Sequence, residues 1–228
     1  MYEERPTALA GAVAWTRSGV AGEAVLVLPD GCMDLLWLDD HLVVAGADQQ
    51  AYEAAADHPA VVSGVRIVPG TAPALLATPA HVLRDQRVRL DDLWAGSVVR
   101  RLEDAVASSG PDPRRGLEAV ATALAATADP VAPVVAAVVA GLRAGRPVAV
   151  VADEVGLSSR QLQRRALDAF GYGPKVLARV LRLQRALTGA RTGIPFAQVA
   201  ATTGYADQAH LAREVRVLTG TTLGRLVG

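Results

Sequence analysis

Three polar residues near the middle of the carboxyl-terminal half, Arg160, Gln163 and Arg164, have the side chains and spacing to read DNA bases. At positions i, i+3 and i+4 they share one face of a helix. The opposite face of this predicted helix is apolar and consists of Leu162, Ala166 and Phe170. Arginine pairs bidentately with guanine, and glutamine with adenine, in the major groove. The pattern therefore predicts a helix that contacts base edges or phosphates.

A second predicted helix near the carboxyl end repeats this arrangement with fewer charges. Its buried stripe consists of Leu211, Val215 and Leu218. Its outward face consists of Gln208, Ala209, Ala212, Arg213 and Arg216. Because two of these positions are alanine, we expect the second helix to contribute mainly backbone contacts, through Arg213.

Both helices belong to an internal repeat. Val151-Ala152, Gly156, Leu162, Arg164 and Gly171 are echoed by Val199-Ala200, Gly204, Leu211, Arg213 and Gly220, with an offset of 48 residues before the turn and 49 after it. A short helix with alanine four residues before glycine, followed at once by a second helix, is typical of a helix-turn-helix. Ser158 and Asp207 offer side-chain acceptors that cap the two second helices.

A long helix starting at Pro174 is predicted between the two units. Its apolar seam consists of Val176, Val180, Leu183 and Leu187. Such a helix holds the units at a fixed separation, so that two recognition helices about 34 Å apart, one DNA turn, can enter successive major grooves. The basic residues of this helix are Lys175, Arg179, Arg182 and Arg185. The sequence is consistent both with phosphate contact by these residues and with a face that only meets solvent.

The formal net charge of zero conceals an uneven distribution. Residues 129–228 contain 13 Lys and Arg against 6 Asp and Glu, whereas residues 1–128 contain 10 against 17. A basic domain can displace counterions from a polyanion, and an acidic one cannot. The Asp129-Pro130 step is therefore our predicted domain boundary.

The amino-terminal half has the pattern of short strands followed by two helices. β-branched runs separated by turn residues predict strands over 24–28, 33–38, 42–45 and 61–68, forming a small antiparallel sheet or barrel. From Asp91 the apolar period becomes helical. The break Ser108-Ser109-Gly110-Pro111 divides this stretch into a helical hairpin that links the domains or supplies a dimer surface.

Residues 131–228 resemble the DNA-binding domain of the AraC/XylS family of bacterial regulators. The most specific stretches are Leu157-Ser158-Ser159-Arg160-Gln161-Leu162-Gln163-Arg164, Gly204-Tyr205-Ala206-Asp207-Gln208-Ala209-His210-Leu211-Ala212-Arg213-Glu214 and Val217-Leu218-Thr219-Gly220. The resemblance implies a seven-helix bilobal domain whose recognition helices start near Ser159 and Asp207. It also implies base contacts from Arg160, Gln163 and Arg164 on the first helix, and from Gln208, Ala209, Ala212 and Arg213 on the second. The sequence departs from the family at Ala166, Val215 and Thr222-Leu223, which indicates a repacked core.

The amino-terminal half resembles the small β-rich domain found ahead of this module in some actinobacterial members. The likeness lies in Leu28-Pro29-Asp30-Gly31-Cys32-Met33-Asp34-Leu35, in Gly64-Val65-Arg66-Ile67-Val68-Pro69-Gly70 and in Leu90-Asp91-Asp92-Leu93-Trp94. By analogy with relatives whose barrel binds an effector, we hypothesise a pocket for an apolar or aromatic small molecule. Its expected lining is Trp15, Cys32, Met33, Trp37, Tyr52 and Arg66, although large apolar residues in a small barrel commonly just fill the core, and Arg66 can pair with an acidic neighbour.

The sequence therefore predicts an α+β chain in three parts. These are a β-rich, barrel-like or cupin-like sensor domain over 1–90, the helical hairpin over 91–128, and an all-α bilobal double helix-turn-helix domain over 129–228. A single cysteine excludes an internal disulfide, and His41, His58, His81 and His210 show no metal-ligand spacing. We expect no metal, no cofactor and no catalytic residue, because the motifs of nucleophilic and phosphate-binding enzymes are missing. The segment 1–7 lacks signal-peptide character and apolar runs are short, so a cytoplasmic protein without membrane contact is expected.

The resulting hypothesis is a sequence-specific DNA-binding transcriptional regulator, controlled by a small effector or by dimerisation through its amino-terminal half. Its expected partners are double-stranded DNA, the effector, RNA polymerase and a second copy of the chain. Two alternatives remain open. One is an interaction protein with a degenerate helix-turn-helix domain, suggested by Ala209 and Ala212. The other is an amino-terminal enzyme or alkyl-acceptor domain tethered to DNA, in which Cys32 accepts the group.

Overall fold

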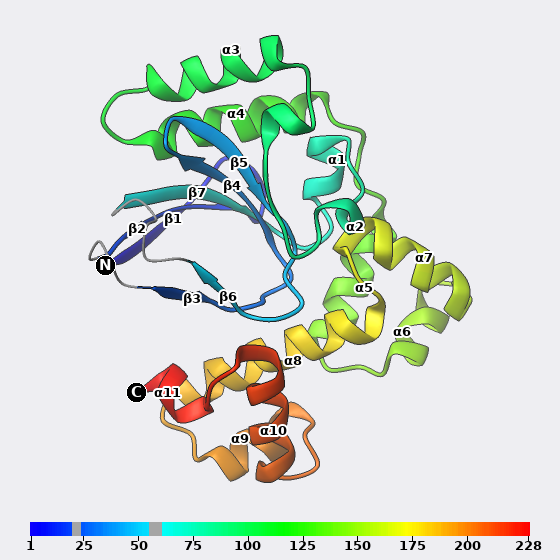
Figure 1. The fold of residues 1–228 in the computed structure, drawn as a ribbon. Coiled ribbons are helices and arrows are strands. Elements are labelled where there is room, and N and C mark those ends of the chain that lie inside the picture. The colour runs from blue at the N-terminus through cyan, green and yellow to red at the C-terminus, as the bar shows by residue number, and fades with distance from the viewer. Residues whose placement is uncertain (20–23, 55–60) are drawn as a thin grey trace.

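The computed structural model describes residues 1–19, 24–54 and 61–228. Its amino-terminal part is built on a six-stranded antiparallel sheet in the order β1-β2-β7-β4-β5-β8 (Figure 1). The strands are β1 (Tyr2–Pro6), β2 (Val13–Ser18), β4 (Met33–Leu38), β5 (His41–Ala45), β7 (Val61–Ile67) and β8 (Arg87–Arg89). A separate ribbon pairs β3 (Val25–Val27) with β6 (Tyr52–Ala54). This two-stranded ribbon lies opposite one face of the six-stranded sheet (Figure 1).

Alternation along the strands gives the sheet two different faces. On β4, Met33 and Leu35 enter the main core, whereas Leu36 belongs to a small cluster on the other face. On β7, Val65 and Ile67 face the main core and Val62 faces the small cluster. One face is therefore closed by helices, and the other turns toward the β3–β6 ribbon.

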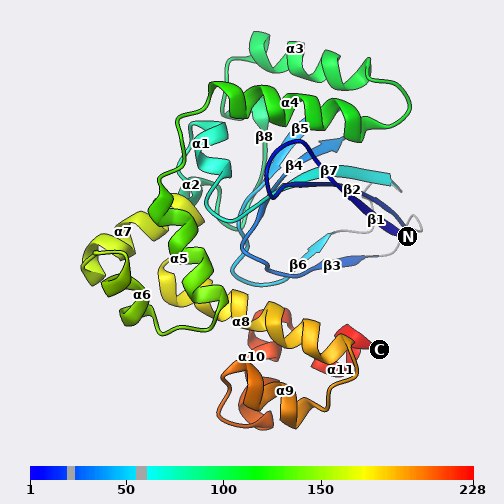
Figure 2. The same cartoon turned by 180° about the vertical axis from the view of Figure 1, so that it is seen from behind.

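Helices cover the first face in two layers, as Figures 1 and 2 show. Two short helices, α1 (Ala72–Leu76) and α2 (Ala80–Leu83), and the turn η1 (Leu90–Asp92) precede the hairpin of α3 (Gly96–Ala107) and α4 (Pro113–Thr127). Helix α4 packs on β2, β4 and β7, and α3 packs against α4 and also contacts β5, where the Leu42 amide donates to Glu103 at 3.0 Å. Asp112 caps α4 by accepting a hydrogen bond from the Arg114 amide at 3.1 Å. The predicted helical hairpin is confirmed.

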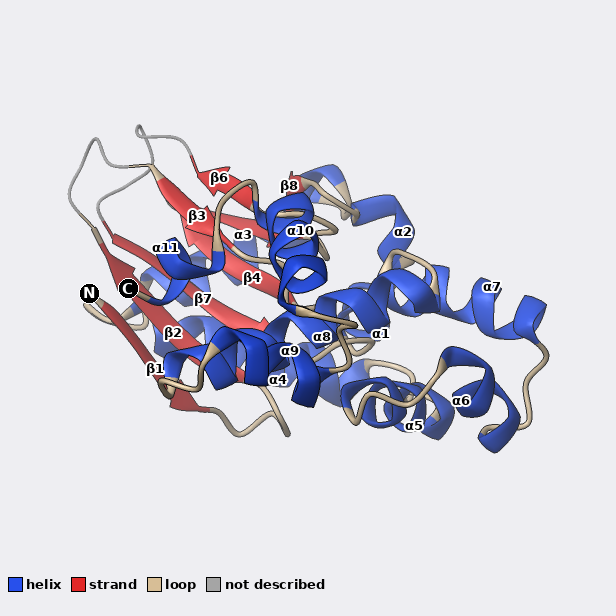
Figure 3. Ribbon diagram, turned by 90° about the horizontal axis from the view of Figure 1, so that it is seen from below, coloured by secondary structure: helices blue, strands red, loops and turns tan. Residues whose placement is uncertain are grey.

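Seven helices follow within the described carboxyl-terminal part, as the resemblance implied. They are α5 (Pro133–Arg143), α6 (Val148–Glu154), α7 (Ser159–Phe170), α8 (Pro174–Arg191), α9 (Phe196–Thr203), α10 (Gln208–Thr219) and α11 (Leu223–Val227). Figure 3 shows the last three helices beneath the sheet, with α5 to α7 beyond its end. No helix in the described ranges is long and apolar enough to cross a bilayer.

The two helix-turn-helix units are packed differently. The main core runs without interruption from the sheet through α5, α6 and α7 to Leu181 in the middle of α8. A separate core begins at Leu183 and contains the inner faces of α9, α10 and α11. We call α5 to α7 with the first half of α8 the first lobe, and the second half of α8 with α9 to α11 the second lobe.

The predicted α+β fold class is confirmed, and the strands expected at 33–38, 42–45 and 61–68 are present nearly to the residue. Strands β1, β2, β6 and β8 and helices α1 and α2 were not predicted. Strand β1 is a largely exposed edge strand with the sequence YEERP, and therefore has no alternating apolar pattern.

A candidate nucleic-acid interface and an adjoining cavity

Local sequence fixes both ends of the first candidate recognition helix, α7. The Ser158 side chain accepts from the Gln161 amide, and the Gln161 side chain accepts from the Ser158 amide at 2.9 Å, which is a capping box. At the other end Gly171 adopts φ 81°, the left-handed conformation that ends many helices. Ser158 is thus confirmed as a cap, and the helix begins at Ser159.

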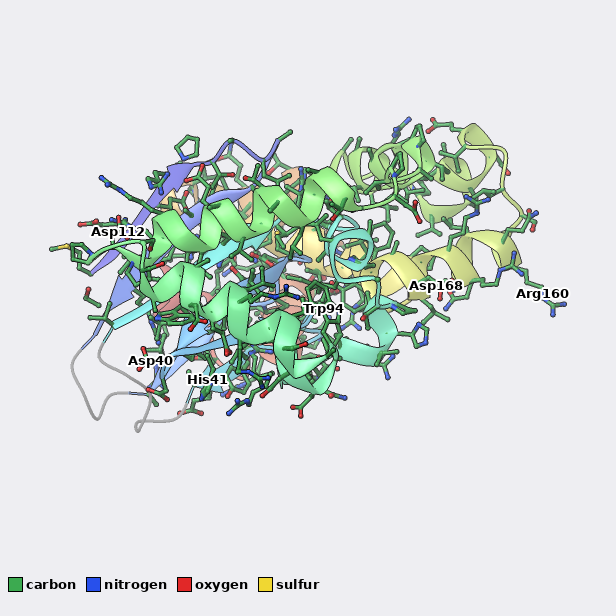
Figure 4. The ribbon with its side chains drawn as sticks, turned by 90° about the horizontal axis from the view of Figure 1, so that it is seen from above. Asp40, His41, Trp94, Asp112, Arg160 and Asp168 are labelled. Atoms are coloured by element: carbon green, nitrogen blue, oxygen red, sulfur yellow. The ribbon has the colours of Figure 1, made fainter. Side chains whose placement is uncertain are left out.

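The outward face of α7 is open to solvent. Its exposed residues include Ser159, Arg160, Gln163 and Arg164, while Leu162, Ala166 and Phe170 are buried as predicted. Figure 4 shows Arg160 at the far end of α7, pointing away from the rest of the molecule. The Gln163 amide is different, because it lies over the turn between α7 and α8. A β-carbon placed on Gly173 would come within 2.6 Å of it.

The second candidate recognition helix, α10, is capped by Asp207, whose Oδ1 accepts from the His210 amide at 2.6 Å. Leu211, Val215 and Leu218 are buried. The exposed residues include all of the predicted outward face, Gln208, Ala209, Ala212, Arg213 and Arg216. Periodicity therefore identified which face of each helix is available.

The basic residues of α8 are mostly engaged inside the protein. Arg182 donates two hydrogen bonds to Glu214 at 2.8 and 2.7 Å and lies over the Tyr205 ring, and Arg179 donates to the same carboxylate at 3.2 Å. Burial raises the pKa of Glu214, but Arg182 and Arg179 outweigh this and lower it. Arg179 thus holds α8 against α10, and phosphate contact by it stays a prediction.

Arg185 and Lys175 are the other two basic residues that the sequence singled out on α8. Arg185 donates to the carbonyl oxygens of Arg143 at 2.8 Å, Leu142 at 3.2 Å and Thr203 at 3.3 Å, and so ties α5 to the end of α9. Of the four basic residues named on this helix, Lys175 is the one that is exposed as a whole residue, although the Arg179 side chain is 41% exposed.

A cavity of about 650 Å³ lies between the β3–β6 ribbon and the face of the sheet that turns toward it. Helix α8 contributes Gln184 and Arg191 to the cavity wall. Four of the predicted lining residues, Trp15, Cys32, Tyr52 and Arg66, do line it. Met33 and Trp37 do not, which corrects that part of the hypothesis. On β4 the cavity face carries Asp34, Leu36 and Leu38, so Met33 and Trp37 at the intervening positions turn to the main core.

A charged cluster occupies one part of the cavity wall. The Arg66 Nε lies 3.3 Å from Asp30 and 3.5 Å from Asp34, without hydrogen-bond geometry to either, and Trp15 donates to Asp34 at 2.6 Å. Burial lowers the pKa of Arg66, but the two carboxylates outweigh it and raise the pKa. Burial also raises the pKa of Asp34 to about 6, although Arg66 opposes this. The carboxyl therefore titrates near neutrality.

Sequence reasoning missed several polar residues of this cavity. Arg87 donates two hydrogen bonds to Asp48 at 2.8 and 2.7 Å and lies over the Tyr52 ring. Arg17 on β2 has a buried Nη1 with no hydrogen-bond partner among the described residues. These positions could have been found only by recognising β2 and β8, whose alternation places Arg17 and Arg87 on one face. His58 lies outside the described residues.

Comparisons with known proteins address the two parts of the chain separately. Residues 151–227 match the family model described as a helix-turn-helix domain, and residues 12–89 match that of a domain of unknown function, DUF6597. No curated protein sequence matches this chain.

Solved structures of ToxT from Vibrio cholerae have a similar fold. An apo form of a ToxT variant from strain SCE256 gives a TM-score of 0.51 at 9% identity, covering 97% of this chain and 98% of that one. ToxT from strain O395 gives 0.49 at 10% identity, covering 100% and 98%. At these identities the likeness concerns the fold. The expected order of domains is thus found: an AraC-type helix-turn-helix domain follows an amino-terminal β-rich domain.

Proposed function

We propose that this protein is a sequence-specific DNA-binding transcriptional regulator. The observation that carries the proposal is the pair of capped helices, α7 and α10, each exposing a polar face, that lie on either side of the single long helix α8. Two such helices held by one rigid element suit two successive major grooves. The excess of basic residues over 129–228 supplies counterion release on DNA.

The two helices have different roles in this proposal. Arg160 and Arg164 read base edges in the first groove, because both side chains extend into solvent from the exposed face. Gln163 joins them after its amide leaves the α7–α8 turn. On α10, Gln208 and Arg213 make the polar contacts, and Ala209 and Ala212 let the backbone approach closely. Ser159 and Lys175 contact phosphates.

We further propose that the cavity takes a small effector with an apolar body and a hydrogen-bond-accepting or anionic group. The lining offers an apolar surface from β3, Leu36 and Val62. Buried nitrogens of Arg17 and Arg66 have no hydrogen-bond partner in the described parts of the chain, and buried donors of this kind favour an acceptor from a ligand. Dimerisation through α3 and α4 and contact with RNA polymerase remain predictions.

The alkyl-acceptor alternative is disfavoured by the surroundings of Cys32. Burial raises the pKa of this thiol, and the neighbouring Asp30 and Asp34 raise it further, so the reactive thiolate is rare at neutral pH. Mass spectrometry after treatment with a methylating agent checks this: an unmodified Cys32 is expected, and a stoichiometric adduct would revive the alternative.

Selection from a random DNA library by the full-length protein at about 150 mM salt tests the proposed function. We expect enrichment of two short sequence blocks about one helical turn apart. The full chain is needed because the main core crosses residue 129, so a fragment starting there would expose apolar surface. No enrichment, with or without extracts containing small molecules, would favour the interaction-protein alternative.

A further inference from the structure

The loop over residues 28–32, between β3 and β4, has one side on the cavity. Leu28, Pro29, Asp30 and Cys32 all line the cavity. Asp30 shapes the loop by accepting a hydrogen bond from the Cys32 amide at 2.8 Å. The same carboxylate reaches Arg66 across the wall at 3.3 Å. The conformation of the loop is therefore tied to the charged groups that an occupant of the cavity would meet.

The other side of the same loop touches the first lobe. Gly31, at φ 86°, lies beside two residues of this lobe: a β-carbon placed on it would lie 3.3 Å from Leu177 and 3.7 Å from the Tyr172 hydroxyl. Tyr172 directly follows Gly171, the residue that ends α7. It is 1% exposed, and its hydroxyl has no hydrogen-bond partner in the described ranges. The loop therefore lies next to the residue that follows the end of the first recognition helix.

The loop also reaches the second lobe. The Pro29 carbonyl oxygen accepts a hydrogen bond from Gln184 Nε2 at 2.7 Å, and Leu28 packs against the separate core of that lobe. Gln184 lies on α8 between Leu183 and Ala186, which belong to this core. One five-residue segment thus contacts the cavity and both helix-turn-helix units.

We propose that the loop 28–32 is the element through which the state of the cavity controls DNA binding. A ligand group that takes the Arg66 donors weakens the Asp30–Arg66 pair, the loop relaxes, and the Pro29–Gln184 bond and the packing of Leu28 on the second lobe change together. The two recognition helices are then repositioned relative to one another. This rests on the proposed function, and it specifies how the cavity regulates it.

We call this coupling from Arg66 through Asp30 and the loop 28–32 to Gln184 the relay. The substitution Asp30→Asn tests the relay in the full-length protein without a ligand. Asparagine keeps an acceptor for the Cys32 amide and removes the charge that faces Arg66. The matched control is Glu4→Gln, the same chemical change at a carboxylate that also lines the cavity but lies on β1, outside the loop. Thermal unfolding monitored by circular dichroism establishes that both variants are folded.

Hydrogen exchange of residues 174–191 and 208–219 is the first readout, and it does not depend on DNA binding. We expect faster exchange in both segments of Asp30→Asn and parent-like exchange in Glu4→Gln. Unchanged exchange in Asp30→Asn, or the same change in both variants, would overturn the relay. The hydrogen-exchange measurement tests the relay even if the selection experiment finds no DNA sequence.

Affinity for the selected operator is the second readout. We expect Asp30→Asn to change Kd by about fivefold or more, the effect of losing the hydrogen bond from Gln184 to Pro29 when the loop relaxes. In a Gln184→Ala background the same substitution should change Kd by less than about twofold, because the link to α8 is already cut. Equal effects in both backgrounds would contradict the relay while leaving the regulator function intact.

Discussion

The first and second lobes of the helix-turn-helix domain resemble each other in sequence but differ in how the rest of the molecule holds them. In the first lobe, Phe170 and Tyr172 belong to the core that continues into the sheet. The second lobe has a core of its own. The amino-terminal part reaches it through the Gln184 bond to Pro29, a bond at 2.7 Å from the Ala51 amide to the Leu218 carbonyl, and the packing of Leu28.

This difference assigns different mechanical roles to the two recognition helices. Helix α7 is fixed to the β-rich domain, because moving it would open a continuous apolar core. Helix α10 belongs to a unit whose attachments are mostly polar, and such contacts each contribute about 1 kcal/mol. We therefore expect the second lobe to change position more easily than the first when DNA or an effector binds.

The largest expected effect comes from breaking the shared core. Phe170→Ala should destabilise the whole chain by about 3 to 5 kcal/mol, since the removed ring leaves a cavity at the junction of the first lobe and the sheet. Its counterpart, Leu211→Ala in the separate core, should lower the stability of the second lobe alone by about 2 to 5 kcal/mol. Differential scanning calorimetry should show one shifted transition for Phe170→Ala and a split transition for Leu211→Ala. A split for both would contradict the comparison.

The next effect is a pH dependence that arises in the β-rich part. Burial raises the pKa of Asp34 from 3.8 to about 6. Between these values the folded state binds more protons than the unfolded state, so lowering the pH through this window should increase stability, by at most about 3 kcal/mol. Urea unfolding at pH 4 to 7 measures this. Asp34→Asn should remove the contribution, and an unchanged pH profile in that variant would assign it to another group.

The second lobe should show the opposite dependence. Arg182 and Arg179 lower the pKa of Glu214 despite its burial, so the stabilisation from this carboxylate is present above pH 4.5 and lost as the pH falls through its lowered folded value. Glu214→Gln should destabilise the second lobe by about 1 to 3 kcal/mol at neutral pH. Hydrogen exchange resolved by segment provides the measurement. Equal loss of protection in β4 and β7 would show that the second lobe is not independent of the sheet.

Sequence reasoning succeeded where one short-range signal determines the result. Ser158 and Asp207 cap the helices that were predicted for them, and the apolar stripe of α10 is buried. It failed where the outcome depends on tertiary pairing. Met33 and Trp37 are as apolar as Leu36 and Leu38, and only the register of β4 shows that they face away from the cavity.

The charged residues show the same limit. Arg179 and Arg182 have the spacing of a solvated or DNA-facing stripe, yet the approach of Glu214 from another helix engages both. The resemblance implied two lobes, but it did not indicate which lobe shares the core of the sheet, because the two repeats have similar apolar patterns. Contacts between residues far apart in the sequence, such as Gly70 with Phe170, determine whether a lobe joins the sheet.

The most direct test of the central claim measures the affinity of the full-length protein and its Arg164→Ala variant for the selected operator, at fixed salt near 150 mM. The matched control is Arg165→Ala, an arginine next to it in the sequence that periodicity did not assign to the reading face. Our account predicts a loss of about 1 to 3 kcal/mol for Arg164→Ala, roughly 5- to 150-fold in Kd, with relaxed selectivity confined to one of the two sequence blocks. Parent-like affinity and selectivity in Arg164→Ala would contradict it.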